Sequence, residues 1–274
     1  MANSDISLTS GMRRNVTSLQ KTVELLNRTQ ERLGTGKKVN SALDNPTSYF
    51  AAQSHLSRAT DLSARKEGMS EAIQVVRAAD AGITGISELI DSAKGLAQAA
   101  RSATTAERSS LASQFDSLLT QINNLATDAS YKGKNLLQGE NLTVEFNENG
   151  SNTLTVQGFT ASYTQLNISK AFGNGAKKWE DDTDIDASVA ELDAAQSTLR
   201  SESAKLAANL SAITVRQDFT TAMISTLTEG ADNLTLADMN EEGANMLMLQ
   251  TRQALGTVAL SLSSEAAQSV LRLF

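Results

Sequence analysis

The apolar residues near the start of the chain recur at alternating spacings of three and four, which is the heptad pattern of a helix that buries one stripe against a partner. The stripe consists of Leu8, Met12, Val16, Leu19, Val23, Leu26 and Leu33, with Gln30 in step. Gly34 and Gly36 follow, and glycines in this position commonly end a helix. The last segment repeats the pattern with Leu255, Ala259, Leu262, Ala266, Val270 and Leu273, followed by Phe274. We predict one amphipathic helix at each end.

These two end segments carry opposite net charge. Residues 1–40 hold seven basic and three acidic side chains, whereas residues 233–274 hold four acidic and two basic ones. Two helices that each carry an apolar stripe and have opposite net charges are expected to pair, although exposed charge pairs contribute little energy. A two-helix unit alone is marginal, so we predict that both ends are disordered in a lone subunit and fold against neighbouring copies. The alternative is an ordinary bundle within one chain.

The middle of the chain contains three more helical patterns and one change of period. Residues 47–100 read as one long helix. Thr104 to Glu107 form a capping-box sequence that opens a second helix, and Ser188 to Glu191 repeat it before a third of about forty residues. Between residues 141 and 172, alternating apolar positions flank Asn149-Gly150 and predict a β-hairpin. We read the acidic stretch around residues 180–186 as a solvated link, for which a calcium loop is the less favoured alternative.

The amino-acid composition argues against most catalytic and metal-binding functions. The 274 residues include no Cys and 1 His, which leaves no disulfide, no thiolate metal site and little basis for His-based catalysis. A net charge of −7 argues against a nucleic-acid partner, and no apolar run is long enough to insert in a membrane. Gly34 to Lys38 lack the spacing of a phosphate-binding loop. With 4% aromatic residues and 1 Pro, the chain suits long helices packed side by side rather than a compact enzyme. We expect no enzyme activity, no metal and no cofactor.

Three short segments resemble bacterial flagellins. The family carries a segment like E-R-L-S-S-G-x-R-I-N-S-A-x-D-D-x-A-G after its first helix, and residues 31–48 read E-R-L-G-T-G-K-K-V-N-S-A-L-D-N-P-T-S. Residues 131–139 are similar to the family's F-N-G-x-x-L-L-x-G, and residues 268–274 are similar to its Q-x-V-L-x-L-L ending. The resemblance covers residues 1–140 and 187–274 and is nearest to the short flagellins of alphaproteobacteria.

The resemblance implies a mainly α fold, with long helices in a rod, a small β-hairpin, and N- and C-terminal helices that form a coiled coil. Residues 1–42 and 231–274 would form the inner coiled-coil domain, residues 43–140 and 188–230 the outer rod, and residues 141–187 a short variable surface region. Leu8, Met12, Val16, Leu19, Val23, Leu26, Leu33, Leu255, Leu262, Val270, Leu273 and Phe274 would serve assembly. The spoke between inner and outer domains would contain Arg32, Asn40, Asp44 and Pro46, the only proline.

The implied function is a structural subunit that polymerises into the extracellular flagellar filament. The partners would be copies of the chain or sibling flagellins, a flagellar export chaperone, and the filament cap and hook-junction proteins. Alternatives are a hook–filament junction protein and a type III secreted translocator or needle-tip protein.

One family site is altered. The stretch recognised by the vertebrate Toll-like flagellin receptor resembles Q-R-V-R-E-L-A-V, and here it reads Asp91, Ser92, Ala93, Lys94, Gly95, Leu96, Ala97 and Gln98. Because one arginine is replaced by Ser92 and the glutamate by Gly95, we expect weak receptor activation.

Overall fold

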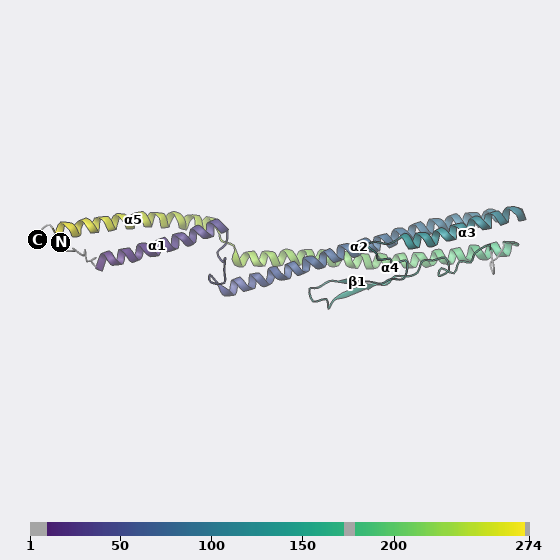
Figure 1. Cartoon of the computed structure of the whole chain (residues 1–274), viewed down its shortest axis with the longest axis horizontal. Helices are drawn as coiled ribbons and strands as arrows, with labels where there is room; N and C mark the ends of the chain where they lie inside the picture. The colour runs from purple at the N-terminus through teal and green to yellow at the C-terminus, as the bar shows by residue number, and fades with distance from the viewer. Residues whose placement is uncertain (1–9, 173–178, 272–274) are drawn as a thin grey trace. The chain divides into compact units, whose positions relative to one another are not determined.

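A computed structural model describes residues 10–172 and 179–271, and within them the protein is built of long helices and one small sheet (Figure 1). The elements are α1 (Ser10–Thr35), α2 (Pro46–Arg101), α3 (Thr105–Asp128), β1 (Leu142–Glu145), β2 (Thr153–Val156), α4 (Asp182–Thr235) and α5 (Met239–Leu271). The predicted mainly α class with a single hairpin is confirmed, and α2 matches the helix expected over residues 47–100 to within one residue at each end.

The chain divides into two compact units. The terminal unit consists of residues 1–57 and 226–274, and the central unit consists of residues 58–225. Helices α2 and α4 therefore contribute to both units, each with one end in the terminal unit. The finer division into five segments that the flagellin resemblance implies stays a prediction.

In the terminal unit, α1 and α5 lie side by side (Figure 1). The stripe predicted on α1 faces inward: Met12 and Leu26 are buried, and Val16, Leu19, Val23 and Leu33 are half-buried. Gln30 is exposed instead, and Thr29 takes the buried position beside it. Gly34 lies inside α1, whereas Gly36 ends it with φ +72°, and the Gly36 N–H donates to Arg32 O at 2.8 Å. The structure thus describes a helix pair within one chain, and disorder of the ends in a lone subunit stays a prediction.

The central unit has one continuous apolar core. Side chains of α2, α3 and α4 contribute to it together with the hairpin and the segment that follows the hairpin. Phe115 of α3 packs against Trp179 with their ring centroids 5.0 Å apart, and both are fully buried. The Trp179 indole N–H is satisfied as well, because it donates to Ser188 Oγ at 3.0 Å. This cluster fixes the segment before α4 onto α3.

The hairpin is the one that the alternating pattern predicts. Strands β1 and β2 pair antiparallel, with Leu142 opposite Val156 and Val144 opposite Leu154. Gly150 has φ +68°, a left-handed conformation that an L-residue rarely adopts, at the turn expected from Asn149-Gly150. Val144 and Val156 are buried in the core of the central unit, while Thr143 and Thr155 face solvent.

Of the two predicted capping boxes, one is confirmed and one is wrong. Thr104 donates from its backbone N–H and its hydroxyl to Glu107 Oε2, each at 2.8 Å, directly before α3. Ser188 does not cap a helix, because α4 already begins at Asp182 and Ser188 is a buried position within it. The two acidic residues of the first turn, Asp182 and Asp184, suit the positive end of the helix dipole and explain the earlier start. The acidic stretch is therefore partly helical rather than a loop.

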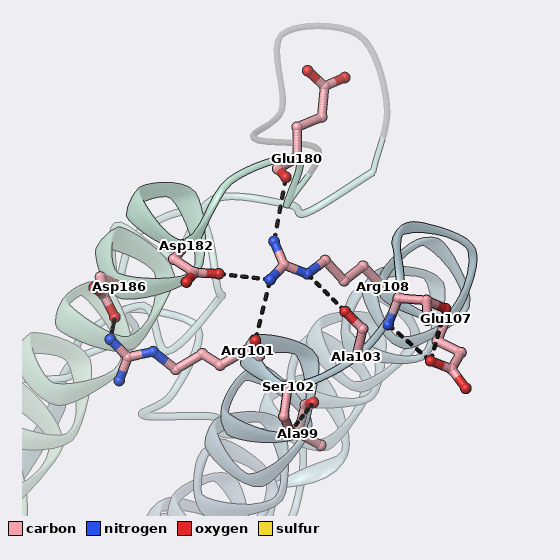
Figure 2. A network of polar contacts seen from close by, with 10 residues as sticks. Ala99, Arg101, Ser102, Ala103, Glu107, Arg108, Glu180, Asp182 and Asp186 are labelled. Atoms are coloured by element: carbon pink, nitrogen blue, oxygen red, sulfur yellow. Dashed lines mark hydrogen bonds and ion pairs between the residues drawn. The ribbon is translucent and has the colours of Figure 1, made fainter.

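Arg108 ties the start of α4 to the α2–α3 connection (Figure 2). Its guanidinium donates to the carbonyl oxygens of Arg101, Ala103 and Glu180 at 3.1, 3.3 and 3.2 Å, and to Asp182 Oδ1 at 2.6 Å. The Arg108 side chain is only 15% exposed. A neighbouring pair, Arg101 with Asp186, is 2.5 Å long but about half exposed on both sides.

Replacing Arg108 by lysine should lower the free energy of unfolding of the central unit by about 2 kcal/mol, because one ammonium cannot serve four acceptors spread around a planar fork. The matched variant Arg101→Ala should cost less than about 0.5 kcal/mol, since that pair is solvent-exposed. Urea unfolding followed by the fluorescence of Trp179, the only tryptophan, measures both. Equal losses for the two variants would contradict the role assigned to Arg108.

Candidate assembly surface

A buried ion pair connects the end of α1 with the start of α5. Arg32 Nη1 lies 2.8 Å from Glu242 Oε1, and the two residues are 210 positions apart in the chain. The side chain of Glu242 is 9% exposed and that of Arg32 is 29% exposed. Because a buried carboxylate is costly without a partner, this pair fixes which turn of α1 lies beside which turn of α5.

Backbone contacts around this pair close the junction. The Lys38 N–H donates to Thr235 O at 2.7 Å, and the Ala237 N–H donates to Gly36 O at 3.0 Å. Lys37 and Leu236 form an isolated antiparallel bridge. The segments that leave α1 and enter α5 are thus held together by the backbone as well as by the charges of Arg32 and Glu242.

The loop between α1 and α2 is organised by Asp44. Its Oδ2 accepts the backbone N–H groups of Ser41 at 2.9 Å and of Asn40 at 3.0 Å. The Asn40 side chain in turn donates to Thr35 Oγ1 at 3.1 Å, which ties the loop back to α1. Asn40 and Asp44, both inferred from the flagellin resemblance, therefore act together. Leu43, at the tip of the turn, is 96% exposed.

The pKa of the Asp44 carboxyl lies below its ordinary value of 3.8, chiefly because the N–H groups of Ser41 and Asn40 stabilise its charged form. A carboxyl whose folded pKa is depressed contributes stability above the unfolded pKa and loses it as pH falls through the folded pKa. We expect the amide resonances of Asn40 and Ser41 to shift together below pH 3.8 as the loop opens. In Asp44→Asn this acid transition should be absent; an unchanged transition would refute the assignment to Asp44.

Pro46 begins α2 rather than breaking a helix. It is the first residue of α2, where a proline costs nothing because its missing N–H has no partner in the helix anyway. Asn45 precedes it and caps the helix, with its Oδ1 accepting the Ser48 N–H at 3.1 Å. The fixed φ of Pro46 thus sets where the loop ends and α2 starts.

Helix α5 has two apolar faces. The inner face, toward α1, carries Glu242, Leu249, Gly256 and Leu260 at buried or half-buried positions. A Cβ added at Gly256 would lie 3.0 Å from Leu19 Cδ1, so α1 passes closely over this glycine. The opposite face carries large apolar residues that are exposed by between 48% and 67%, namely Leu247, Met248, Leu255, Val258 and Leu262. We call these five residues the outer stripe of α5.

The outer stripe follows a helical heptad. Met248, Leu255 and Leu262 are seven residues apart, and Val258 lies between the last two. At about 100° per residue, Leu247 and Val258 point nearly opposite to Leu249 and Gly256, whereas Met248, Leu255 and Leu262 point roughly 80–140° away from them, so α1 covers these side chains only in part. Leu255 and Leu262 were expected from the sequence; Met248, Val258 and Leu247 were missed. A search for seven-residue spacing that extended back from Leu255 would have found Met248.

Of the other residues that were expected to serve assembly, some lie within the described residues and some lie outside them. Met12, Val16, Leu19, Val23, Leu26 and Leu33 all lie on the side of α1 that is wholly or partly buried. Leu8, Leu273 and Phe274 lie outside the described residues, as does the side chain of Val270. The role of all these residues in assembly stays a prediction.

The altered receptor stretch lies on α2 in the central unit. Asp91 accepts a hydrogen bond from Gln196 Nε2 at 2.9 Å, and Lys94 pairs with Asp193 at 2.5 Å, so both contact α4. Ser92 and Gly95 are exposed, and Leu96 is half-buried against the core. The two substituted positions therefore face solvent.

Two features that would indicate other functions are absent from the described residues. No helix among them has the length and hydropathy to cross a membrane. In the same part of the chain, no three His, Cys, Asp or Glu side chains are grouped so that they could hold a metal ion.

The chain is similar to known flagellins in sequence. The model of the bacterial flagellin N-terminal helical region matches residues 6–142, which is half of the 274-residue chain. Flagellin FljO of Caulobacter vibrioides is 29% identical over 279 aligned residues, which span 100% of both chains. A flagellin of Brucella melitensis biotype 1 is 29% identical over 269 residues, 94% of each chain. The crystal structure of a Bacillus cereus flagellin aligns with a TM-score of 0.48 and 17% identity, over 56% of this chain and 88% of that one.

Proposed function

The chain belongs to the bacterial flagellin family, and from that premise we propose that the outer stripe of α5 is a surface through which its copies polymerise. The protein is a structural subunit of the extracellular bacterial flagellar filament, the helical propeller of swimming cells. The observation that carries the proposal is the row of five apolar side chains, each about half to two-thirds exposed, on the side of α5 that faces away from α1.

Physical reasoning supports this use of the stripe. Large apolar side chains that line one helix face at heptad spacing are typical of a surface that binds another helix. Fully burying a leucine contributes about 1.5–3 kcal/mol, so the stripe favours association strongly once several copies are present. If the stripe binds a different surface of the next subunit, the contact repeats without closing and produces a filament.

The other partners follow from the same premise. We propose that the chain is exported with the help of a flagellar chaperone and meets the filament cap and hook-junction proteins on assembly. We further propose that it has no catalytic activity, because the family to which it belongs is structural and its sequence has 1 His and no Cys to act as base or nucleophile. The solvent-facing Ser92 and Gly95 support the expectation of weak receptor activation; a strong response to purified subunit in a reporter cell would overturn it.

Electron microscopy after salt-induced polymerisation tests the proposed function. Purified full-length chain should form long tubes of uniform width, and a variant lacking residues 265–274 should form none while still being secreted. A junction protein or a needle-tip protein would not grow into long tubes on its own. Normal filaments from the truncated variant would contradict the assembly role predicted for Val270, Leu273 and Phe274, which it lacks.

A further inference from the structure

Met248 is the one residue of the outer stripe whose side chain contains sulfur. Its side chain is 48% exposed, it lies seven residues before Leu255, and it is a thioether among aliphatic residues. A thioether is readily oxidised to a sulfoxide, which turns a flexible apolar side chain into a polar one. The chain has no Cys, so no thiol competes for an oxidant.

We propose that Met248 is a modification site at which peroxide-class oxidants block polymerisation of the free subunit. This proposal rests on the proposed function, because it needs the outer stripe to be buried in the filament. In the reaction a peroxide transfers one oxygen atom to the sulfur of Met248. The peroxide O–O bond breaks, a new S–O bond forms, hydrogen peroxide leaves as water, and the thioether loses two electrons to the peroxide.

The other described methionines differ from Met248 in exposure or in position. Met223 and Met246 are half-buried, and Met246 points about 160° away from Met248 on α5. Met69 is 0% exposed and Met12 is 5% exposed, so peroxide should react with them slowly. Met239 is 48% exposed, the same as Met248, and it too belongs to α5. Nine residues before Met248, however, Met239 points in a direction about 180° away and lies off the outer stripe. Met239 should therefore oxidise as readily as Met248 but without effect on assembly.

The consequence for assembly follows from desolvation. In the filament a sulfoxide oxygen at position 248 would have to leave water and enter an apolar contact, which is costly without a hydrogen-bond donor. We expect the critical concentration for polymerisation to rise at least about tenfold on oxidation of Met248. Because the filament would cover the same side chain, assembled subunits should be protected, and a methionine sulfoxide reductase should restore free ones.

The test uses full-length chain, hydrogen peroxide as the oxidant, and the variants Met248→Leu and Met239→Leu. Mass spectrometry of peptides follows oxidation at each methionine, and light scattering with electron microscopy follows polymerisation. Oxidation should raise the critical concentration of wild type and of Met239→Leu at least about tenfold, whereas it should leave the critical concentration of Met248→Leu at the value that this variant has before treatment. Met248 in preassembled filaments should oxidise several-fold more slowly than in free subunits.

The outcomes separate the two proposals. If untreated wild type forms no filaments, the proposed function itself fails. If untreated wild type forms filaments and the fully oxidised chain does so at the same critical concentration, only the inference about Met248 is overturned. Loss of polymerisation in oxidised Met248→Leu, with Met239 as the oxidised site, would overturn it as well.

Discussion

Filaments should not form when Leu255 and Leu262 are both replaced by glutamine. In the subunit these two residues are 65% and 61% exposed on the outer stripe, so the substitution removes little packing within the subunit. Burying each leucine at a contact between subunits should contribute about 1–2 kcal/mol, and a buried glutamine without partners adds a penalty. Together these effects amount to about 3 kcal/mol or more, which raises the critical concentration by more than about a hundredfold. Sedimentation of the polymer against subunit concentration measures the change.

A matched control lies on the same helix. Thr257 and Ser261 are also exposed, but they lie on the flank of α5 between the outer stripe and the inner face. The variant Thr257→Gln with Ser261→Gln adds the same polar groups and should change the critical concentration less than about threefold. Circular dichroism should show equal helix content in both variants. Wild-type assembly of the Leu255 and Leu262 variant would exclude the outer stripe from the filament contact.

The heptad pattern was sufficient to predict both terminal helices and the inward face of α1, because α1 has one apolar stripe. It was not sufficient for α5, which has two. The sequence stripe through Leu255 and Leu262 gives no sign that a second heptad, through Leu249, Gly256 and Leu260, faces α1 instead. Only contacts at long range decide between the faces, and the small size of Gly256 beside Leu19 is one such contact.

Other differences between the predicted and the observed structure also arise from contacts outside the local sequence pattern. The capping sequence at Ser188 is locally sound, yet Trp179 uses the Ser188 hydroxyl as an acceptor from nine residues away. Thr104 and Glu107, in contrast, are three residues apart and form the capping box that local pattern predicted. Interactions between residues close in sequence were predictable here, whereas the pairing of Arg32 with Glu242 was not, since either end segment offers several charges of the right sign.

Arg32 should prove the most sensitive charged residue of the terminal unit. Replacing it by alanine leaves the Glu242 carboxylate buried without its partner at 2.8 Å, which should cost about 3 kcal/mol. Because the filament requires the helix pair in its folded form, the critical concentration for polymerisation should rise about a hundredfold. Arg28→Ala is the matched control, since Arg28 lies one turn earlier on α1 and is exposed; it should change the critical concentration less than about threefold.

A double-mutant cycle separates the ion pair from general damage to α1. The variant with both Arg32→Ala and Glu242→Ala has no buried charge left unpaired, so it should polymerise better than Arg32→Ala alone. Arg32→Lys should fall between wild type and Arg32→Ala, because an ammonium keeps the charge but loses the fixed geometry of the guanidinium. If the losses of the two single variants simply add in the double variant, Arg32 and Glu242 are not coupled, and the junction is held by its backbone contacts alone.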